Sequence, residues 1–141
     1  MAFSLSITGC AALIDRARDF ENALEKSEES TALIVMSDYV PEGTEMFTIV
    51  CPYEPVLLVS ERLGVPISEI PDYSRVEGLN ALVSVADNHV NSVLQFNAWE
   101  ISLCEQNGAW GQVYLLPNDL AFVKQPDGKW VLDEVVSTAD G

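Results

Sequence analysis

The chain has 141 residues, of which 22 are acidic and 7 are basic, so its formal net charge is −15 and its isoelectric point is near 4.1. Hydrophobic residues make up 48% of the sequence, which supplies enough apolar material for a core and excludes a disordered chain. The negative field repels nucleic acid and anionic lipid, and no apolar run approaches the roughly 18 residues of a membrane span, so we exclude direct nucleic-acid binding and membrane association. No linker-like segment divides the chain, so we expect one domain, residues 1–141.

The chain begins with a predicted strand and a predicted helix. Phe3, Leu5 and Ile7 alternate with polar residues, which is the period of a half-buried strand. Over residues 11–26, apolar positions recur at helical spacing, so we expect an amphipathic helix with one face on a sheet. Cys10 ends a lipobox-like Ile-Thr-Gly-Cys motif, but a basic segment and a long apolar run are missing before it, so we expect no signal peptide and no lipidation.

The three cysteines are far apart in the sequence and odd in number. They are Cys10, Cys51 and Cys104. Proteins of oxidising compartments favour paired cysteines, so this pattern argues against a disulfide framework and fits a reducing compartment. The expected lack of a signal peptide and of a membrane span predicts a cytoplasmic location. The close cysteine pairs of zinc sites, the calcium-loop pattern and the phosphate-binding glycine loops are all missing, so we expect no metal and no cofactor.

The middle of the chain predicts strands and a second helix. Thr31–Ser37 is a continuous apolar run, which predicts a central strand covered on both faces, and Met46–Cys51 predicts a strand that pairs with it. Pro55–Ile70 fits a helix or a strand equally well, because Pro55 suits a helix start whereas the apolar residues after it suit a strand. Ser74-Arg-Val-Glu77 has the spacing of a capping box, so we expect a second helix from there to Asp87-Asn88.

The C-terminal third, residues 93–136, predicts an antiparallel β-meander. Asn107-Gly108 is typical of a two-residue type I′ turn. That turn fixes a register in which Ile101 faces Tyr114 and in which Trp99 lies on the same, apolar face of the hairpin. A buried aromatic side chain on such a face is usually part of the packing.

Pro126-Asp127-Gly128 predicts the turn of a second hairpin, made of residues 120–125 and 129–136. Its expected core side chains are Phe122, Trp130 and Leu132. Together these elements predict an α+β fold with a single mixed or antiparallel sheet, a C-terminal β-meander and two helices packed on one face.

His89 is the only histidine, so a classical catalytic base would have to be this residue or a carboxylate. Asp87 and Ser84 lie nearby in the sequence, but no nucleophile elbow and no cysteine-enzyme signature surrounds them. Paired carboxylates carry little information in a chain this acidic, because some will meet by chance. We interpret His89 as a surface residue and expect no enzymatic activity.

The leading functional hypothesis is a non-enzymatic binding protein that docks its acidic surface on a basic partner. Carboxylates can mimic phosphate spacing or complement a basic active site, and they speed association. In size and charge the chain resembles immunity proteins and inhibitors of nucleic-acid enzymes, including nucleic-acid mimics, so we expect a basic protein partner such as a nucleic-acid-processing enzyme or a toxin. The predicted partner-binding residues come from a segment without Lys or Arg: Glu28, Glu29, Asp38, Glu42, Glu45 and Glu54.

The alternative hypothesis is a small-molecule-binding domain. In that case Trp99, Tyr114 and Trp130 of the meander would line a pocket. A cavity open on one side of the sheet would favour this reading, and a fully packed core would count against it. A secretion chaperone or dimeric scaffold of similar size and acidity is also left open, so a homodimer stays compatible with the sequence.

Overall fold

The computed structural model describes residues 16–105 and 110–137, and a helix occupies residues 16–25. The predicted strand at Phe3–Ile7, Cys10 and the Asn107-Gly108 turn lie outside the described residues. The later helix and strands are β1 (Thr31–Ile34), β2 (Met46–Val50), α2 (Val56–Leu63), β3 (Leu79–Ala86), β4 (His89–Asn97), β5 (Ile101–Ser102), β6 (Val113–Leu115), β7 (Asn118–Lys124) and β8 (Trp130–Ser137). Short 3-10 turns, η1 (Met36–Asp38) and η2 (Ile67–Glu69), follow β1 and α2.

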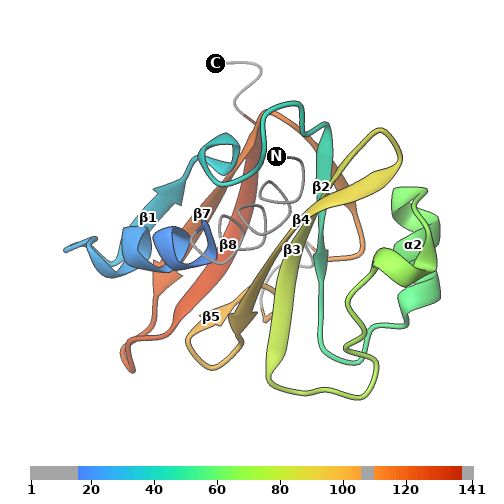
Figure 1. Ribbon diagram of the computed structural model, residues 1–141. Helices are drawn as coiled ribbons and strands as arrows, with labels where there is room; N and C mark the ends of the chain where they lie inside the picture. Colours follow the sequence, from blue (N-terminus) through green and yellow to red (C-terminus); the bar gives the residue numbers. More distant parts are fainter. Residues whose placement is uncertain (1–15, 106–109, 138–141) are drawn as a thin grey trace, which may run out of the picture.

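The described strands form two four-stranded sheets, with the orders β1-β7-β8-β5 and β4-β3-β2-β6 (Figure 1). Neighbouring strands are antiparallel except for β5, which runs parallel to β8. The single sheet that the sequence predicts is therefore wrong, whereas the mixed α and β composition is confirmed. The C-terminal third does not stay together as a meander, because β4 and β6 join one sheet and β5, β7 and β8 join the other.

The predicted register of the first C-terminal hairpin is also wrong. Ile101 pairs with Trp130 of β8, and Tyr114 pairs with Phe47 of β2. The sequence pattern is local, but these strands pair with partners that are distant along the chain. Trp99 precedes β5 and is 64% exposed, so it does not lie on a buried face as predicted.

The second C-terminal hairpin is confirmed. Strands β7 and β8 pair antiparallel, with Lys124 opposite Trp130 at the turn. Gly128 has φ +94°, a conformation that side chains with a Cβ rarely adopt, as the Pro-Asp-Gly sequence predicts. The three side chains expected in the core, Phe122, Trp130 and Leu132, are each at most 4% exposed.

The second predicted helix is wrong, because the capping-box segment leads into strand β3. Both faces of β3 are buried, so its apolar residues follow no clean period of two and their spacing also fits a helix. Asp87 and Asn88 have φ values of +53° and +63° and form the two-residue turn between β3 and β4. The second helix is instead α2, within Pro55–Ile70, and Gly64 ends it in the left-handed conformation.

Strand β1 lies at the edge of its sheet, not at its centre as predicted. Among the described strands it pairs with β7 alone, and Leu33 is 57% exposed. Strand β2 pairs with β3 and β6 and not with β1, which corrects the hairpin expected between them. An apolar run does not by itself tell a central strand from an edge strand.

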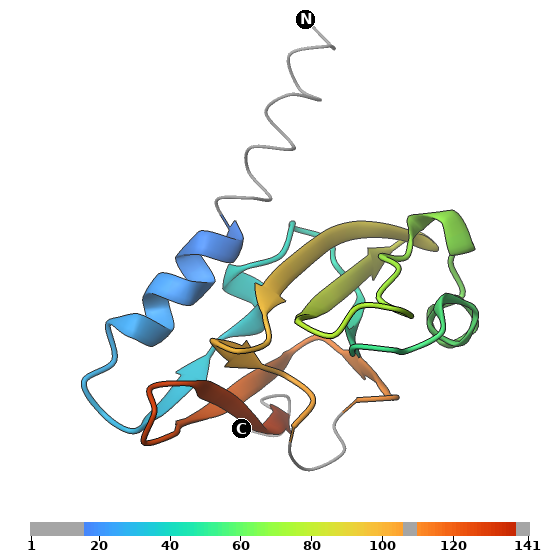
Figure 2. The same cartoon turned by 90° about the horizontal axis from the view of Figure 1, so that it is seen from below.

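Two clusters of buried side chains hold these layers together. The inter-sheet core lies between the two sheets and under the helix of residues 16–25, and the outer core lies between the β2–β3 sheet and α2 (Figures 1 and 2). The helices therefore cover different parts of the molecule, not one face as predicted. Large members of the inter-sheet core are Phe20, Phe47, Phe96, Phe122 and Leu132. Large members of the outer core are Val59, Leu63, Ile70 and Tyr73.

A disulfide joins Cys51, directly after β2, to Cys104, which follows β5. The two cysteines are 53 positions apart, and their partnership appears only when the two sheets pack together. The expectation of unpaired cysteines is thus wrong for this pair. Within residues 16–105 and 110–137, no helix is both long and apolar enough to cross a bilayer.

Candidate functional site

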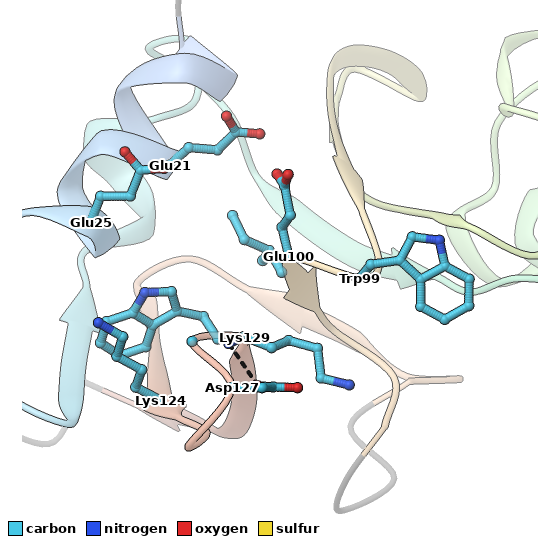
Figure 3. A pocket seen from close by; sticks show the side chains of 10 residues that line it. Glu21, Glu25, Trp99, Glu100, Lys124, Asp127 and Lys129 are labelled. Atoms are coloured by element: carbon cyan, nitrogen blue, oxygen red, sulfur yellow. Dashed lines mark hydrogen bonds between the residues drawn. The ribbon is translucent and has the colours of Figure 1, made fainter.

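A cavity of about 390 Å³ opens between the helix of residues 16–25, the segment before β5 and the β7–β8 turn (Figure 3). We call it the acidic cavity. Its size falls in the range of small-ligand sites, roughly 300–1,000 Å³. Its walls come from parts of the chain that are far apart in sequence, and the inter-sheet core holds them in place: Phe20 and Leu24 anchor the helix, and Ile101 and Trp130 anchor the opposite wall.

Three carboxylates give the cavity its character. Glu21 and Glu25 lie one turn apart on the helix, and Glu100 rises from the segment before β5. Figure 3 shows Glu21 and Glu100 pointing toward one another across the opening. Burial raises the pKa of the Glu21 carboxyl, the neighbouring charges of Glu100 and Glu25 raise it further, and Arg18 partly offsets these effects. The cavity therefore holds like charges whose repulsion a bound cation would relieve.

Trp99 and Trp130 supply the aromatic part of the lining. Trp130 is 4% exposed and belongs to the inter-sheet core, whereas most of the Trp99 surface is open to solvent. The Trp99 backbone is nevertheless fixed, because its N–H donates to Asn97 Oδ1 at 2.8 Å. Its indole edge lies against Gly78, where an added Cβ would be 3.4 Å from Nε1. An aromatic side chain that is both exposed and held is suited to contact a ligand.

Two lysines border the cavity, and both already have partners. Lys124 Nζ lies 5.8 Å from the centre of the Trp130 ring, a cation–π distance. Lys129 Nζ donates to Glu105 Oε2 at 2.7 Å, and this hydrogen bond lowers the pKa of Glu105. The dashed line in Figure 3 marks the bond from the Lys129 backbone N–H to Asp127 Oδ1. Neither lysine is paired with Glu21 or Glu100 in the described hydrogen bonds and ion pairs.

The acidic residues that the sequence singles out do not gather in one place. Glu28 and Glu29 lie in the exposed connection before β1, and Asp38 and Glu42 are exposed on the connection from β1 to β2. Glu45 directly precedes β2, and its carboxylate accepts the Asp87 backbone N–H at 2.9 Å. These positions line no cavity described here.

Glu54 differs from the other predicted acids because its side chain is only 8% exposed. Its carboxylate accepts a hydrogen bond from Arg62 Nη1 at 2.7 Å and another from the Cys51 backbone N–H at 3.1 Å. Arg62 also donates to Thr48 Oγ1 and to the Ile49 carbonyl. Glu54 thus ties α2 to β2, and its charge is already balanced within the fold.

The structure brings together two of the three predicted pocket aromatics. Trp99 and Trp130 both line the acidic cavity, but Tyr114 lies in the other sheet, where its ring stacks on Phe47 with centroids 5.5 Å apart. Glu21, Glu25 and Glu100 were not among the functional residues predicted from the sequence. The i, i+4 spacing of the two helical acids was a usable signal, since it places like charges on one face of the helix.

His89 is exposed, as predicted, and its Nδ1 lies 2.8 Å from Glu69 Oε2. The other Glu69 oxygen accepts the Val90 backbone N–H, so Glu69 ties η2 to the start of β4, and these hydrogen bonds lower the pKa of Glu69. Among the described residues, no cluster of three or more His, Cys, Asp or Glu side chains has an arrangement that could hold a metal ion.

No family model, curated protein or solved structure matches this chain. The geometry of the acidic cavity is therefore the starting point for a functional assignment.

Proposed function

We propose that this protein is a non-enzymatic acidic binding protein that docks on a basic protein partner through the acidic cavity. The observation that carries the proposal is the convergence of Glu21, Glu25 and Glu100 beside the exposed Trp99. A lysine or arginine of the partner would enter the cavity, pair with the carboxylates and pack on the indole. A partner of this kind could be a nucleic-acid-processing enzyme or a toxin.

The electrostatics of the cavity support this choice. Burial first, and then the neighbouring charges of Glu100 and Glu25, disfavour the ionised form of Glu21 in the unbound protein, so its pKa is raised. A cation bound beside these carboxylates would favour their ionised forms. The net charge of −15 adds long-range attraction, which increases the association rate at low salt.

The six acidic residues that the sequence predicts as partner contacts remain a second proposal for where the partner binds. Five of them are exposed and could extend the contact surface, whereas Glu54 is engaged with Arg62. A small organic cation is the second candidate ligand, because Trp99 and Trp130 line the same cavity as the carboxylates. Both candidates share the chemistry of a positive group bound by carboxylates and an aromatic ring.

A cytoplasmic location stays a prediction. The expected unpaired cysteines fitted a reducing compartment, whereas Cys51 and Cys104 form a disulfide. Such bonds persist mainly in oxidising compartments. We therefore extend the search for the partner to secreted and cell-surface basic proteins.

The test is affinity capture from the source organism with two charge-reversal variants that change the net charge equally. One variant carries Glu21→Lys, Glu25→Lys and Glu100→Lys, and the other carries Glu28→Lys, Glu29→Lys and Glu42→Lys. We expect wild type and the second variant to retain a basic protein that high salt releases, and the first variant to lose it.

Three results would count against this assignment. Loss of the partner only in the second variant would move the docking surface to the acids predicted from the sequence. If both variants retain the partner equally poorly, the cavity contributes only through the overall negative charge of the protein and is not a specific docking site. Failure of wild type to retain any basic protein at low salt would overturn the proposed function.

A further inference from the structure

Three hollows in the surface adjoin one another and together form a groove. The first, about 420 Å³, lies beside α2, the second, about 290 Å³, lies over the disulfide, and the third is the acidic cavity. The first and second share Pro52, Tyr53 and Cys104 in their linings, and the second and third share Trp99 and Lys129. The groove therefore leads from α2 to the helix of residues 16–25, which lie on opposite sides of the molecule in both views (Figures 1 and 2).

The end of the groove at α2 is mainly apolar. Pro52, Pro55, Leu58 and Trp110 line it together with the Cys51–Cys104 disulfide. Glu54 also lines this hollow, and its carboxylate is paired with Arg62. Leu58 and Trp110, which both line this hollow, are 53% and 49% exposed. Exposed apolar surface gathered in a hollow marks an interaction site more strongly than scattered apolar residues do.

Tyr53 stands between the first two hollows in a conformation that non-glycine residues rarely adopt. Its φ is +66°, and its side chain is 58% exposed. Its backbone N–H donates to the Tyr73 carbonyl at 2.8 Å, and this bond helps to hold the turn. Backbone strain of this kind gathers at functional sites. In this protein the strained residue, Tyr53, exposes its aromatic ring to solvent and separates two hollows.

The opposite end of the groove is negative. Glu77 and Glu105 line the middle hollow, and Glu21, Glu25 and Glu100 line the acidic cavity. The groove thus changes from apolar to acidic along its length, with Trp110, Tyr53 and Trp99 spaced along it. A ligand that matches this order must carry apolar groups at one end and positive charge at the other.

We propose that this groove binds an extended, proline-rich segment of the basic partner, with the prolines between Trp110 and Tyr53 and the arginines or lysines in the acidic cavity. The proposal rests on the proposed function and specifies the partner's chemistry. Aromatic-lined grooves bind polyproline II segments because that conformation is already ordered and presents flat apolar rings. Charge complementarity places the basic end of the segment in the acidic cavity.

The separate hollows favour an extended segment over a helix. An α-helix is about 10–12 Å across with its side chains, so it needs one continuous trough. Tyr53 and Trp99 interrupt the groove, and each of the hollows that they separate suits a few side chains of an extended chain. Because proline restricts the unbound segment, less conformational entropy is lost on binding.

The experiment measures fluorescence anisotropy of three labelled peptides of equal length at low salt. The first has consecutive prolines followed by consecutive arginines, the second replaces the prolines with glycine and serine, and the third replaces the arginines with glutamates. We expect the first to bind roughly tenfold more tightly than the second and the third not to bind detectably.

Variants locate the contact. Tyr53→Ala and Trp110→Ala should weaken the first peptide about tenfold and leave the second unchanged, since each removes a ring only from the apolar end. Leu33→Ala, which removes an equally exposed apolar side chain from β1 outside the groove, is the matched control and should change nothing. Unchanged affinity in both ring variants, or equal binding of the first two peptides, would overturn the groove assignment.

The same data separate this inference from the proposed function. If both arginine peptides bind equally and the Glu21→Gln, Glu100→Gln double variant weakens both, cation docking stands and the proline-specific groove is wrong. If no arginine peptide binds and no basic protein is captured, both proposals are wrong. Tight binding of the glutamate peptide would also overturn the assignment of positive charge to the acidic cavity.

Discussion

The two cores of this protein differ in composition and in what they connect. In the inter-sheet core, the Phe20 ring contacts Tyr39, Phe96 and Phe122 with centroids 4.8–5.8 Å apart, so one side chain joins a helix and both sheets. The outer core is mainly aliphatic, and Tyr73 is its one buried aromatic among the described residues. Burial raises the pKa of Tyr73 to about 12, and its hydroxyl donates to Gln95.

The two ends of the groove are built on different cores. The acidic cavity is built on the inter-sheet core, because its helix is anchored there by Phe20 and Leu24. The apolar end of the groove stands next to α2, whose Val59 and Leu63 pack only in the outer core. Stability and binding should therefore respond differently to changes at the two ends.

The largest effect should come from Phe20→Ala. Truncating a buried phenylalanine typically costs about 3–5 kcal/mol of unfolding free energy, and this ring contributes to three aromatic contacts. Val59→Ala in the outer core removes two methyl groups and should cost about 2 kcal/mol. Urea unfolding of both variants measures the difference. Equal losses would mean that the two cores contribute alike.

The disulfide should contribute the next largest share, because it links the end of β2 to the segment after β5. Replacing Cys51 and Cys104 with serine is expected to cost about 2–4 kcal/mol, since the crosslink restricts a long loop in the unfolded chain. Thermal unfolding of wild type with and without reductant provides the same comparison in one protein. An unchanged midpoint would contradict a structural role.

A thiol count tests the same bond in protein purified without reductant. We expect one reactive thiol in the denatured protein, that of Cys10, and three after reduction. Three reactive thiols without reduction would mean that the disulfide is absent, and this result would support a cytoplasmic location. No free thiol, together with an increased mass, would show that Cys10 is modified, and this residue ends the lipobox-like motif.

A smaller effect should distinguish Glu54 from the other acids predicted as partner contacts. Glu54→Gln removes the charge that faces Arg62 in a site where both side chains are at most 13% exposed, and it should cost about 1–3 kcal/mol. The matched variant Glu28→Gln, at an exposed position, should change stability by less than about 0.5 kcal/mol. Chemical unfolding measures both. Similar values would contradict the structural role of Glu54.

Much of the local structure was predictable from the sequence, because local chemistry determines it. Pro-Asp-Gly specifies the β7–β8 hairpin, and the apolar period of residues 16–25 specifies the helix. Strand pairing was not predictable in the same way. The sequence Asp87-Asn88, which forms a turn between strands, is equally typical of a helix end. Strand β5 pairs with β8, which lies almost thirty positions later in the sequence.

The candidate site was less predictable than the fold. Charge composition indicated a basic partner, but Glu21 and Glu100 meet only because the inter-sheet core brings the helix beside β5. Trp99 was expected to be buried because it alternates with Ile101, yet the chain turns before β5 and leaves it outside. A site whose residues come from several distant segments can be identified only once the tertiary structure is known.

The smallest effect, and the one that bears most directly on the acidic cavity, is expected from Glu21→Gln. The pKa of Glu21 is raised in the folded state, first by burial and then by Glu100, so the folded protein binds that proton more tightly than the unfolded chain. Stability contributed by this group is therefore lost as the pH rises from the unfolded pKa through the folded one. Glu21→Gln should slightly raise the urea midpoint at neutral pH and leave it unchanged at about pH 3, where both states are largely protonated. A lower midpoint at neutral pH would show that the ionised Glu21 stabilises the fold, which would contradict an unfavourable environment for its charge in the unbound cavity.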